Sequence, residues 1–334
     1  MSPCSSTTTY TESATGSSRP SGPSSAAENC ADPGNPSRMT ETSRNSSLTP
    51  SGFGAELGDV DLARSDEAMV DEAVDAFHAA GGLVVIRNQG HVDPAHLRRF
   101  VSRFGTPEGN EKYDPAFLVP GFPDILRIGN AKENGKYTAL FIQADPPPLL
   151  WHMDDSFRHP QPIGSCLFCF RTPPEGGETG FAGMTAAYED LPDQVKARIE
   201  SIRTVHSYNH LNELLRKKNP HRPPLSEALL AQFPPIVRPL VARHPETGRK
   251  SLYLPLCHIE SVEGMSPEEG SALLNDLQAH ATGEDYTYMH RWRPGDLVVW
   301  DNRCTLHAPT PFDDTRYERL MFRLTFSGRQ IAGF

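Results

Sequence analysis

The chain is poor in cysteine, lacks long apolar runs and has no block of basic residues. Six cysteines scattered over 334 residues are too few for a disulfide framework. No apolar run reaches about 18 residues and no charged-then-apolar leader opens the sequence, so neither a membrane span nor a signal peptide is expected. These absences predict a protein of the reducing cytoplasm.

The charge balance excludes a second group of partners. The chain carries 32 basic and 42 acidic residues, which gives a net charge of −10. Phosphate backbones and anionic lipid surfaces attract dense stripes of Lys and Arg, and the sequence has none. Nucleic acid and membranes are therefore not expected partners.

Residues 1–48 differ in composition from the rest of the chain. They hold 20 Ser or Thr together with many Pro, Gly and Asn, and too little apolar surface to offset the entropy of ordering them. We expect a disordered tail over 1–48 and a single folded domain over 49–334. An alternative is that the natural start is Met39.

From residue 49 onward, strand patterns outnumber helix patterns. Helices are predicted at 65–80 with Ser65 as the cap, at 93–104, at 193–202, and after the capping box of Ser266 and Glu269. Short β-rich runs separated by Pro and Gly occur at 83–86, 125–129, 163–171, 236–243, 251–255, 296–301 and 319–326, with a hairpin loop at 244–250. Many short strands with few helices favour a closed or two-sheet antiparallel architecture, a barrel or jelly roll.

One short motif suggests metal chemistry. His152 and Asp154 are two residues apart, so in an extended segment both side chains point to the same side and can bind one metal ion. The pair alone is weak evidence, but a further histidine, His307, follows the strand run 296–301. Two imidazoles and one carboxylate on one face of a metal leave three positions open. This arrangement suits Fe(II) that binds a co-substrate and O2 together.

Four ordered motifs resemble a known family. They are His152-x-Asp154, residues 176–179 (GGET), residues 300–303 (WDNR) followed by His307, and residues 319–323 (RLMFR). Over about residues 50–328 their order resembles the Fe(II)/2-oxoglutarate dioxygenases of the taurine dioxygenase and 2,4-dichlorophenoxyacetate dioxygenase group, and most of all the second branch. The resemblance implies a mainly β fold with flanking helices, the double-stranded β-helix or jelly roll of cupin-like proteins.

The resemblance also implies roles for individual residues. The iron ligands would be His152, Asp154 and His307. Arg323 would bind the distal carboxylate of 2-oxoglutarate together with the Thr179 hydroxyl. Arg319 would help to bind the keto-acid end of 2-oxoglutarate or the substrate. A planar guanidinium suits a carboxylate because it can donate two parallel hydrogen bonds. The implied reaction uses O2 to hydroxylate a substrate, with or without subsequent bond cleavage or desaturation, and releases succinate and CO2.

The substrate is predicted only by class. Asn110 and Tyr113 stand where the taurine branch places substrate contacts, and Asn130, after the run 125–129, is a third candidate. Position 110 is not the histidine of that branch, which argues against taurine itself. We expect a small organic anion as substrate and partner. A homo-oligomer is left open, because relatives are often dimers or tetramers.

Two other functions remain open at this point. The same three side chains could bind zinc in a metallohydrolase, which would need no O2 and would give Arg323 no role. A jelly roll that binds 2-oxoglutarate without turnover is the second. Cys166 and Cys169 have CxxC spacing, but no second pair accompanies them, so zinc or redox chemistry is not expected there.

Overall fold

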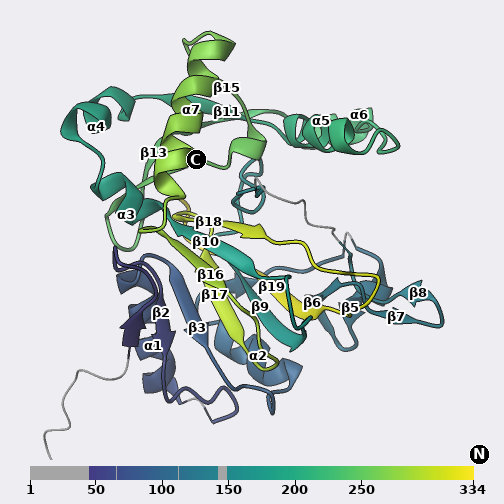
Figure 1. The fold of residues 1–334 in the computed structure, drawn as a ribbon. Helices are drawn as coiled ribbons and strands as arrows, with labels where there is room; N and C mark the ends of the chain where they lie inside the picture. The colour runs from purple at the N-terminus through teal and green to yellow at the C-terminus, as the bar shows by residue number, and fades with distance from the viewer. Residues whose placement is uncertain (1–44, 65, 112, 142–148) are drawn as a thin grey trace, which may run out of the picture. The chain divides into compact units, whose positions relative to one another are not determined.

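Two β-sheets packed face to face form the centre of the fold, and three smaller sheets accompany them. The computed structural model describes residues 45–64, 66–111, 113–141 and 149–334, which belong to one unit. The larger sheet has the order β1 (Asn45–Ser47), β2 (Ala55–Leu57), β3 (Leu83–Ile86), β17 (Leu297–Asp301), β9 (Gly164–Arg171), β19 (Leu320–Ser327), β6 (Phe122–Gly129) and β5 (Leu118–Val119), with β4 (Thr106–Pro107) paired to β19. The smaller sheet has the order β16 (Thr287–His290), β10 (Thr179–Gly183) and β18 (Thr305–Pro309). Figure 1 shows β10, β16 and β18 lying against the middle of the larger sheet.

The predicted jelly roll is confirmed. In both sheets the neighbouring strands of the described residues pair antiparallel, except for the parallel pair β2–β3. Between the sheets, Phe181 of β10 packs against Trp300 of β17 with ring centroids 5.5 Å apart. The buried side chains of Val85, Val298 and Met321 extend this core across the larger sheet.

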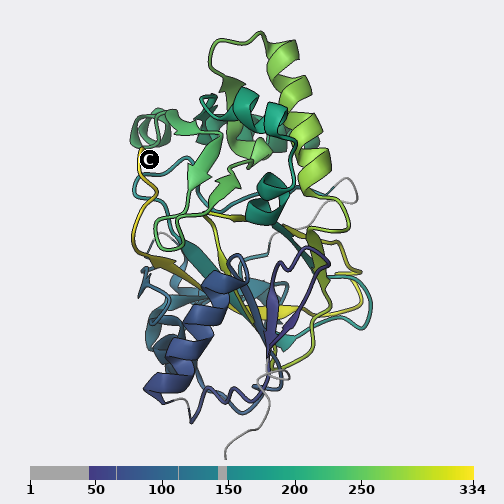
Figure 2. The same ribbon diagram turned by 90° about the vertical axis from the view of Figure 1, so that its left-hand side faces the viewer.

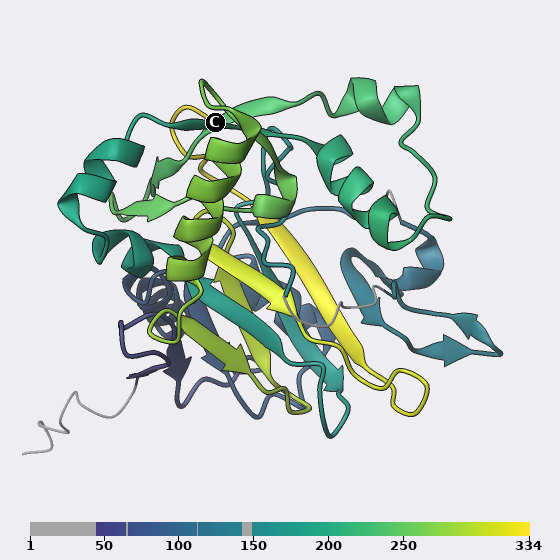
Figure 3. The same cartoon turned by 45° about the horizontal axis from the view of Figure 1, so that its top comes forward.

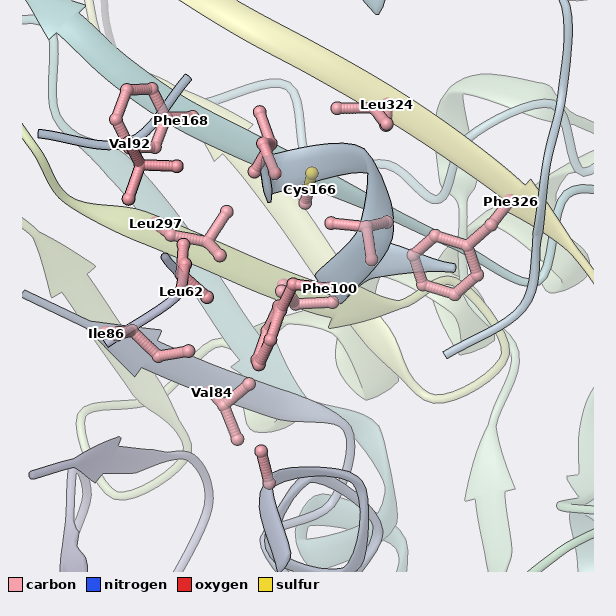
Figure 4. Packing of buried hydrophobic residues seen from close by; sticks show 14 of the residues in the cluster. Leu62, Val84, Ile86, Val92, Phe100, Cys166, Phe168, Leu297, Leu324 and Phe326 are labelled. Carbon is pink, nitrogen blue, oxygen red and sulfur yellow. The ribbon is translucent and has the colours of Figure 1, made fainter. Parts of the chain in front are cut away.

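Two helices cover the other face of the larger sheet. They are α1 (Glu67–Ala79) and α2 (Pro94–Val101), and their apolar faces pack on the cluster shown in Figure 4, which includes Val84, Phe100 and Phe326. Asp93 caps α2, as the sequence predicted. The cap of α1 is Asp66, whose side chain accepts from the Met69 N–H, whereas the expected cap Ser65 lies outside the described residues.

A helical layer covers the far side of the smaller sheet. It contains α3 (Met184–Glu189), α4 (Asp193–Ile199), the capping-box helix α7 (Pro267–Ala281) and the hairpin of β13 (Val241–Arg243) and β14 (Lys250–Leu252). These elements share a second apolar core with Leu306 of β18. Figure 2 shows α7 on the opposite side of the sheets from α1.

A three-stranded sheet and two helices extend from this layer. The sheet consists of β12 (Ile236–Pro239), β11 (Arg203–His206) and β15 (Ile259–Val262), the last entered through the turn η2 (Leu256–His258). The helices α5 (Tyr208–Lys218) and α6 (Glu227–Gln232) project beside it (Figure 3). The remaining small elements are η1 (Pro115–Phe117) and the hairpin of β7 (Lys132–Glu133) and β8 (Lys136–Tyr137).

Several expectations differ from the structure. The run predicted as one strand over 236–243 is divided at Leu240 between two sheets, because Pro239 has no N–H with which to continue a ladder. Helices α3, α5 and α6 were not predicted, nor were the three strands of the smaller sheet. Apart from α5, which has 11 residues, these elements are short, and α6 has no buried residue, so their local patterns are weak.

The N-terminal boundary also differs. The strand β1 lies within the segment 1–48 that was expected to be disordered, and it pairs with β2 through Ser46 and Glu56. The remainder of that segment, 1–44, lies outside the described residues, so its disorder stays a prediction. In the described part of the chain, no helix has the length and apolar character that crossing a bilayer requires.

Truncating Phe100 tests the core beneath α2. Phe100 is fully buried and its ring lies 5.4 Å from that of Phe104. Phe100→Ala should lower the free energy of unfolding by about 3–5 kcal/mol, because it removes apolar contacts and leaves a cavity. The control Leu229→Ala alters an exposed residue of α6 and should change it by less than about 0.5 kcal/mol. Urea unfolding measures both, and equal losses would contradict this description of the core.

Candidate active site

Backbone pairing holds two histidines side by side. The His152 N–H donates to the His307 carbonyl at 2.9 Å, and the His307 N–H donates to the His152 carbonyl at 2.8 Å. Their ring centroids are 4.1 Å apart. The sequence suggested that His307 lies at the end of the strand run 296–301, but it does not belong to that strand. The chain turns after Asp301, and His307 lies in β18 of the smaller sheet, opposite Phe181.

Asp154 completes a group of three ligand-type side chains. Each of His152, Asp154 and His307 offers a ligand atom, and these atoms all lie within 4.8 Å of one another. Asp154 Oδ1 is 3.7 Å from His307 Nε2. Met153 points into the apolar core instead, as the alternation along an extended segment requires. The structure therefore brings together the three side chains that the sequence singled out.

The two oxygens of Asp154 have different surroundings. Arg323 Nη2 and Ser165 Oγ both donate to Oδ2, each at 2.8 Å, so Oδ1 is the oxygen left beside His307. Burial by itself would raise the pKa of Asp154. The Arg323 guanidinium and then the two imidazoles outweigh burial and lower this pKa below its usual range, which keeps the carboxylate ionised for a cation.

Side chains distant in sequence hold the backbone of Asp154. Its N–H donates to Asn302 Oδ1 at 3.2 Å, and its carbonyl accepts from Gln161 Nε2 at 3.0 Å. Asn302 is in turn held by the Trp300 indole, and Gln161 by the Tyr253 hydroxyl. Sequence reasoning missed these supports. Asn302 lay within a recognised motif, but nothing in the local pattern indicated its partner.

Each histidine presents a nitrogen to the centre of the group. His152 Nδ1 lies 3.0 Å from the Leu150 carbonyl, which assigns the proton to Nδ1 and leaves the Nε2 lone pair for a metal. His307 is held by its ring contacts with Trp300 and Phe181, at 4.8 and 6.4 Å between centroids. Burial lowers the pKa of His307 well below its ordinary value, so its imidazole is neutral, the form that binds metals.

Arg319 is a buried cation that has no acidic partner among the described residues. Its side chain is only 8% exposed, and its Nε has no hydrogen-bond partner in the part of the chain that the structure describes. Burial lowers its pKa to about 10, and no carboxylate opposes this. A Cβ atom added at Gly177 would lie 3.5 Å from Arg319 Cδ, so the arginine lies against the GGET segment. An unpaired buried charge lowers the stability of the folded state, so a bound anion beside Arg319 would be stabilising.

Arg319 and Arg323 have different environments. On a regular strand they would share a face with Met321, but the pairing of β19 with β9 shifts register between Leu320 and Met321. Such an irregularity re-aims the residue that precedes it. Arg323 pairs with Asp154, whereas Arg319 lies beside Gly177. The Asp154 carboxylate raises the pKa of Arg323 although burial acts in the opposite direction.

Asn130 supports the chain around Arg319. Its Nδ2 donates to the carbonyls of Asp314 and Tyr317 at 3.1 and 2.9 Å, and its Oδ1 accepts from the Arg319 N–H at 2.7 Å. The carboxamide is therefore used in holding the chain that leads into β19. The contact of Asn130 with a substrate stays a prediction, and these bonds already use both N–H donors of its side chain.

A polar cavity of about 440 Å³ adjoins the metal-type site. Asp154 and Arg323 form its inner wall, and Asn110 and Tyr113 line it as the sequence suggested. Asn110 Nδ2 donates to the Asp124 carbonyl, which leaves its Oδ1 for another partner. The other lining residues are Glu108, Gly109, Glu111, Asp155, Arg158, His159, Gln232, Phe233 and Thr325.

In a second group of ligand-type side chains, formed by His78, His244 and Asp301, the last two are already satisfied internally. In this group, His244 Nε2 lies 3.0 Å from Asp301 Oδ2, and His244 Nδ1 accepts backbone N–H groups of Glu246 and Thr247. Arg303 donates to both oxygens of Asp301, at 2.8 and 2.6 Å. With these atoms occupied, the group stabilises the turn before β18 rather than binding a metal.

Cys166 and Cys169 belong to different apolar cores. Cys166 packs beneath α2, and Cys169 packs between the two sheets. Residues three apart on a strand point to opposite faces, so these thiols cannot bind one ion. Burial raises the pKa of each thiol to about 12.

The fold and this site together define a class of enzyme. A jelly roll that brings one carboxylate and two imidazoles together, and that buries an arginine without an acidic partner among the described residues, is the arrangement of a non-haem iron dioxygenase dependent on 2-oxoglutarate. The family model described as "Taurine catabolism dioxygenase TauD, TfdA family" matches residues 44–325, and the chain belongs to this family. The enzyme accordingly uses Fe(II), 2-oxoglutarate and O2.

Curated relatives come from the same family. The chain is 39% identical to the alpha-ketoglutarate-dependent 2,4-dichlorophenoxyacetate dioxygenase of Burkholderia sp. (strain RASC) over 212 residues, 63% of this chain and 69% of the relative. It is 32% identical to the enzyme of the same name from Cupriavidus pinatubonensis over 265 residues, 78% of this chain and 90% of the relative.

A solved structure is also similar. The crystal structure of AAD-2 in complex with Mn(II) and N-oxalylglycine matches with a TM-score of 0.69 and 29% identity, covering 86% of this chain and 98% of that one.

Removing one of the three candidate ligands should weaken metal binding strongly. Asp154→Ala and His307→Ala should each weaken Fe(II) binding by on the order of 100-fold or more, since even outer contacts to ligands are worth 10–100-fold. Asp155→Ala is the matched control, because its carboxylate pairs with Arg158 and not with the histidines. Anaerobic Fe(II) titration measures each affinity. Iron binding retained in Asp154→Ala would exclude this ligand set.

Proposed function

We propose that this dioxygenase oxidises a small organic anion held beside Arg323, while Arg319 and Thr179 hold the distal carboxylate of 2-oxoglutarate. The observation that carries this proposal is the contrast between the two arginines. Arg319 is buried with no carboxylate among the described residues, whereas Arg323 pairs with Asp154 and is 21% exposed at the wall of the polar cavity. The sequence prediction assigned the distal carboxylate to Arg323, and the contacts favour Arg319.

Two donors converge on the proposed co-substrate end. Arg319 lies against Gly177, and Thr179 follows two residues later at the start of β10. A guanidinium can donate two parallel hydrogen bonds to a carboxylate, and a hydroxyl can add a third. A dicarboxylate whose far end reaches Arg319 would satisfy the buried charge that the folded chain leaves uncompensated.

The substrate end is supported by the cavity and by the relatives. Arg323 shares the cavity wall with Asp154, so a bound anion would lie close to the metal ligands. Asn110 and Tyr113 line the same cavity and are the proposed additional contacts. The named substrate of the two curated relatives, 2,4-dichlorophenoxyacetate, is itself a carboxylate.

The protein contributes ligation, orientation and charge. When bound, Fe(II) and 2-oxoglutarate supply O2-dependent oxidation of a C–H bond with release of succinate and CO2. The chain keeps Asp154 ionised through Arg323 and Ser165, presents the imidazoles of His152 and His307 side by side, and excludes water with the apolar rings of Phe181 and Trp300. It uses no protein nucleophile.

We propose a cytoplasmic location for this enzyme. The four cysteines of the described residues are free and buried, which suits a reducing compartment. Fractionation of native cells with an antibody against the chain tests the location.

An anaerobic titration tests the class of reaction. Adding 2-oxoglutarate to the Fe(II)-loaded protein should produce the weak visible charge-transfer band of an iron–keto acid chelate, and admitting O2 should then release succinate. A metallohydrolase would show neither signal and would turn over its substrate without O2. A sensor would show the band without succinate. Absence of the band in the iron-loaded protein would exclude the proposed function.

Paired substitutions test the division between the arginines. Arg319→Leu should raise the Kd of 2-oxoglutarate by roughly 30-fold or more, because breaking a buried charge pair costs about 2–5 kcal/mol. Arg323→Leu should change this Kd by only a few-fold when Fe(II) is saturating, and should instead weaken substrate binding. Anaerobic titrations of both variants measure the effect. The opposite ranking would restore Arg323 as the co-substrate anchor.

A further inference from the structure

The Thr179 hydroxyl accepts a hydrogen bond from a tryptophan. Thr179 Oγ1 is 3.0 Å from Trp292 Nε1, and both side chains are buried. An indole N–H can only donate, so the threonine oxygen must be the acceptor of this hydrogen bond. The hydroxyl proton of Thr179 is therefore directed away from Trp292.

That proton has no acceptor within the described residues. The bond from Trp292 is the one side-chain hydrogen bond of Thr179 in 45–64, 66–111, 113–141 and 149–334. Arg319 Nε is likewise a buried donor without an acceptor in the described part of the chain, and the arginine stem lies against Gly177, two residues before Thr179. Unsatisfied buried donors are costly, so two of them in one region point to a ligand with acceptor oxygens.

Trp292 is itself rigidly held. It follows β16, and its ring meets that of His290 edge-on with centroids 4.3 Å apart. His290 Nδ1 lies 3.1 Å from the Tyr288 hydroxyl, and His290 Nε2 lies 3.2 Å from Asp296 Oδ2. Arg87 donates to the same Asp296 oxygen at 2.6 Å. The indole N–H thus has a defined direction that a surface residue would lack.

We propose that Trp292 is a positioning residue for the co-substrate. By donating to Thr179 Oγ1, it keeps the threonine proton directed toward the carboxylate that Arg319 binds, so the hydroxyl is already oriented before 2-oxoglutarate arrives. This inference rests on the proposed function. It adds a residue, outside the motifs that the sequence singled out, that acts on the co-substrate through another side chain.

The test is a double-mutant cycle read by equilibrium binding. Trp292→Phe retains an aromatic ring and removes the donor, and should raise the Kd of 2-oxoglutarate for the anaerobic Fe(II) protein by roughly 3- to 10-fold. Thr179→Val removes the hydroxyl and should raise this Kd by roughly 10-fold or more, since a hydrogen bond to a charged group is lost. In the double variant, Trp292→Phe should add less than about a further 2-fold, because nothing remains to orient.

Two controls separate orientation from a general loss of structure. In a Thr179→Ser background, which keeps the hydroxyl, Trp292→Phe should again raise the Kd. With 2-oxovalerate, a keto acid that lacks the distal carboxylate, Trp292→Phe should leave the Kd unchanged. This ligand control applies even if the substitution lowers the melting temperature.

The outcomes distinguish this inference from the proposed function. If the wild-type protein with Fe(II) does not bind 2-oxoglutarate, the proposed function fails. The role of Trp292 is overturned, and the proposed function stands, if the wild type binds 2-oxoglutarate but the increases in Kd caused by Thr179→Val and Trp292→Phe multiply in the double variant. The same conclusion follows if Trp292→Phe raises the Kd of 2-oxovalerate as much as that of 2-oxoglutarate.

Discussion

The antiparallel bridge between His152 and His307 is the interaction on which the site depends. Two reciprocal backbone hydrogen bonds join segments far apart in sequence and set two imidazoles side by side. Asp154 lies two residues further along the same extended segment, so this pairing also brings its carboxylate to the histidines. A shift of one residue in the pairing would turn the ligands into the apolar core that Met153 now fills.

Buried charge is the second organising constraint. The Asp154 carboxylate has Arg323 as counter-ion, and Asp301 has Arg303, so these ions are compensated within the fold. Arg319 has no such acid among the described residues, and its burial is tolerable only because the folded core over-determines its position. A bound anion would stabilise this buried guanidinium, and under the proposed function 2-oxoglutarate binding and folding stability are therefore linked.

Prediction from the sequence succeeded where one local rule was sufficient. The i, i+2 spacing of His152 and Asp154 gave their common direction, and Asp93 and Ser266 gave correct helix starts. It was insufficient where long-range pairing intervened. The irregularity between Leu320 and Met321 separates Arg319 from Arg323, and the carboxamide of Asn130 donates to the chain before β19.

The amino-acid sequence by itself determined the ligand types, their order along the chain and the antiparallel character of the fold, because these follow from residue chemistry and from periods of two to four residues. Only the tertiary structure decided which atoms meet. Strand register and sheet packing determine the hydrogen bonds of Asn302 and Gln161 to the Asp154 backbone. They also determine the separate environments of the two arginines and the contact of Trp292 with Thr179. Such contacts join residues distant in sequence, and no local pattern encodes the distance between them.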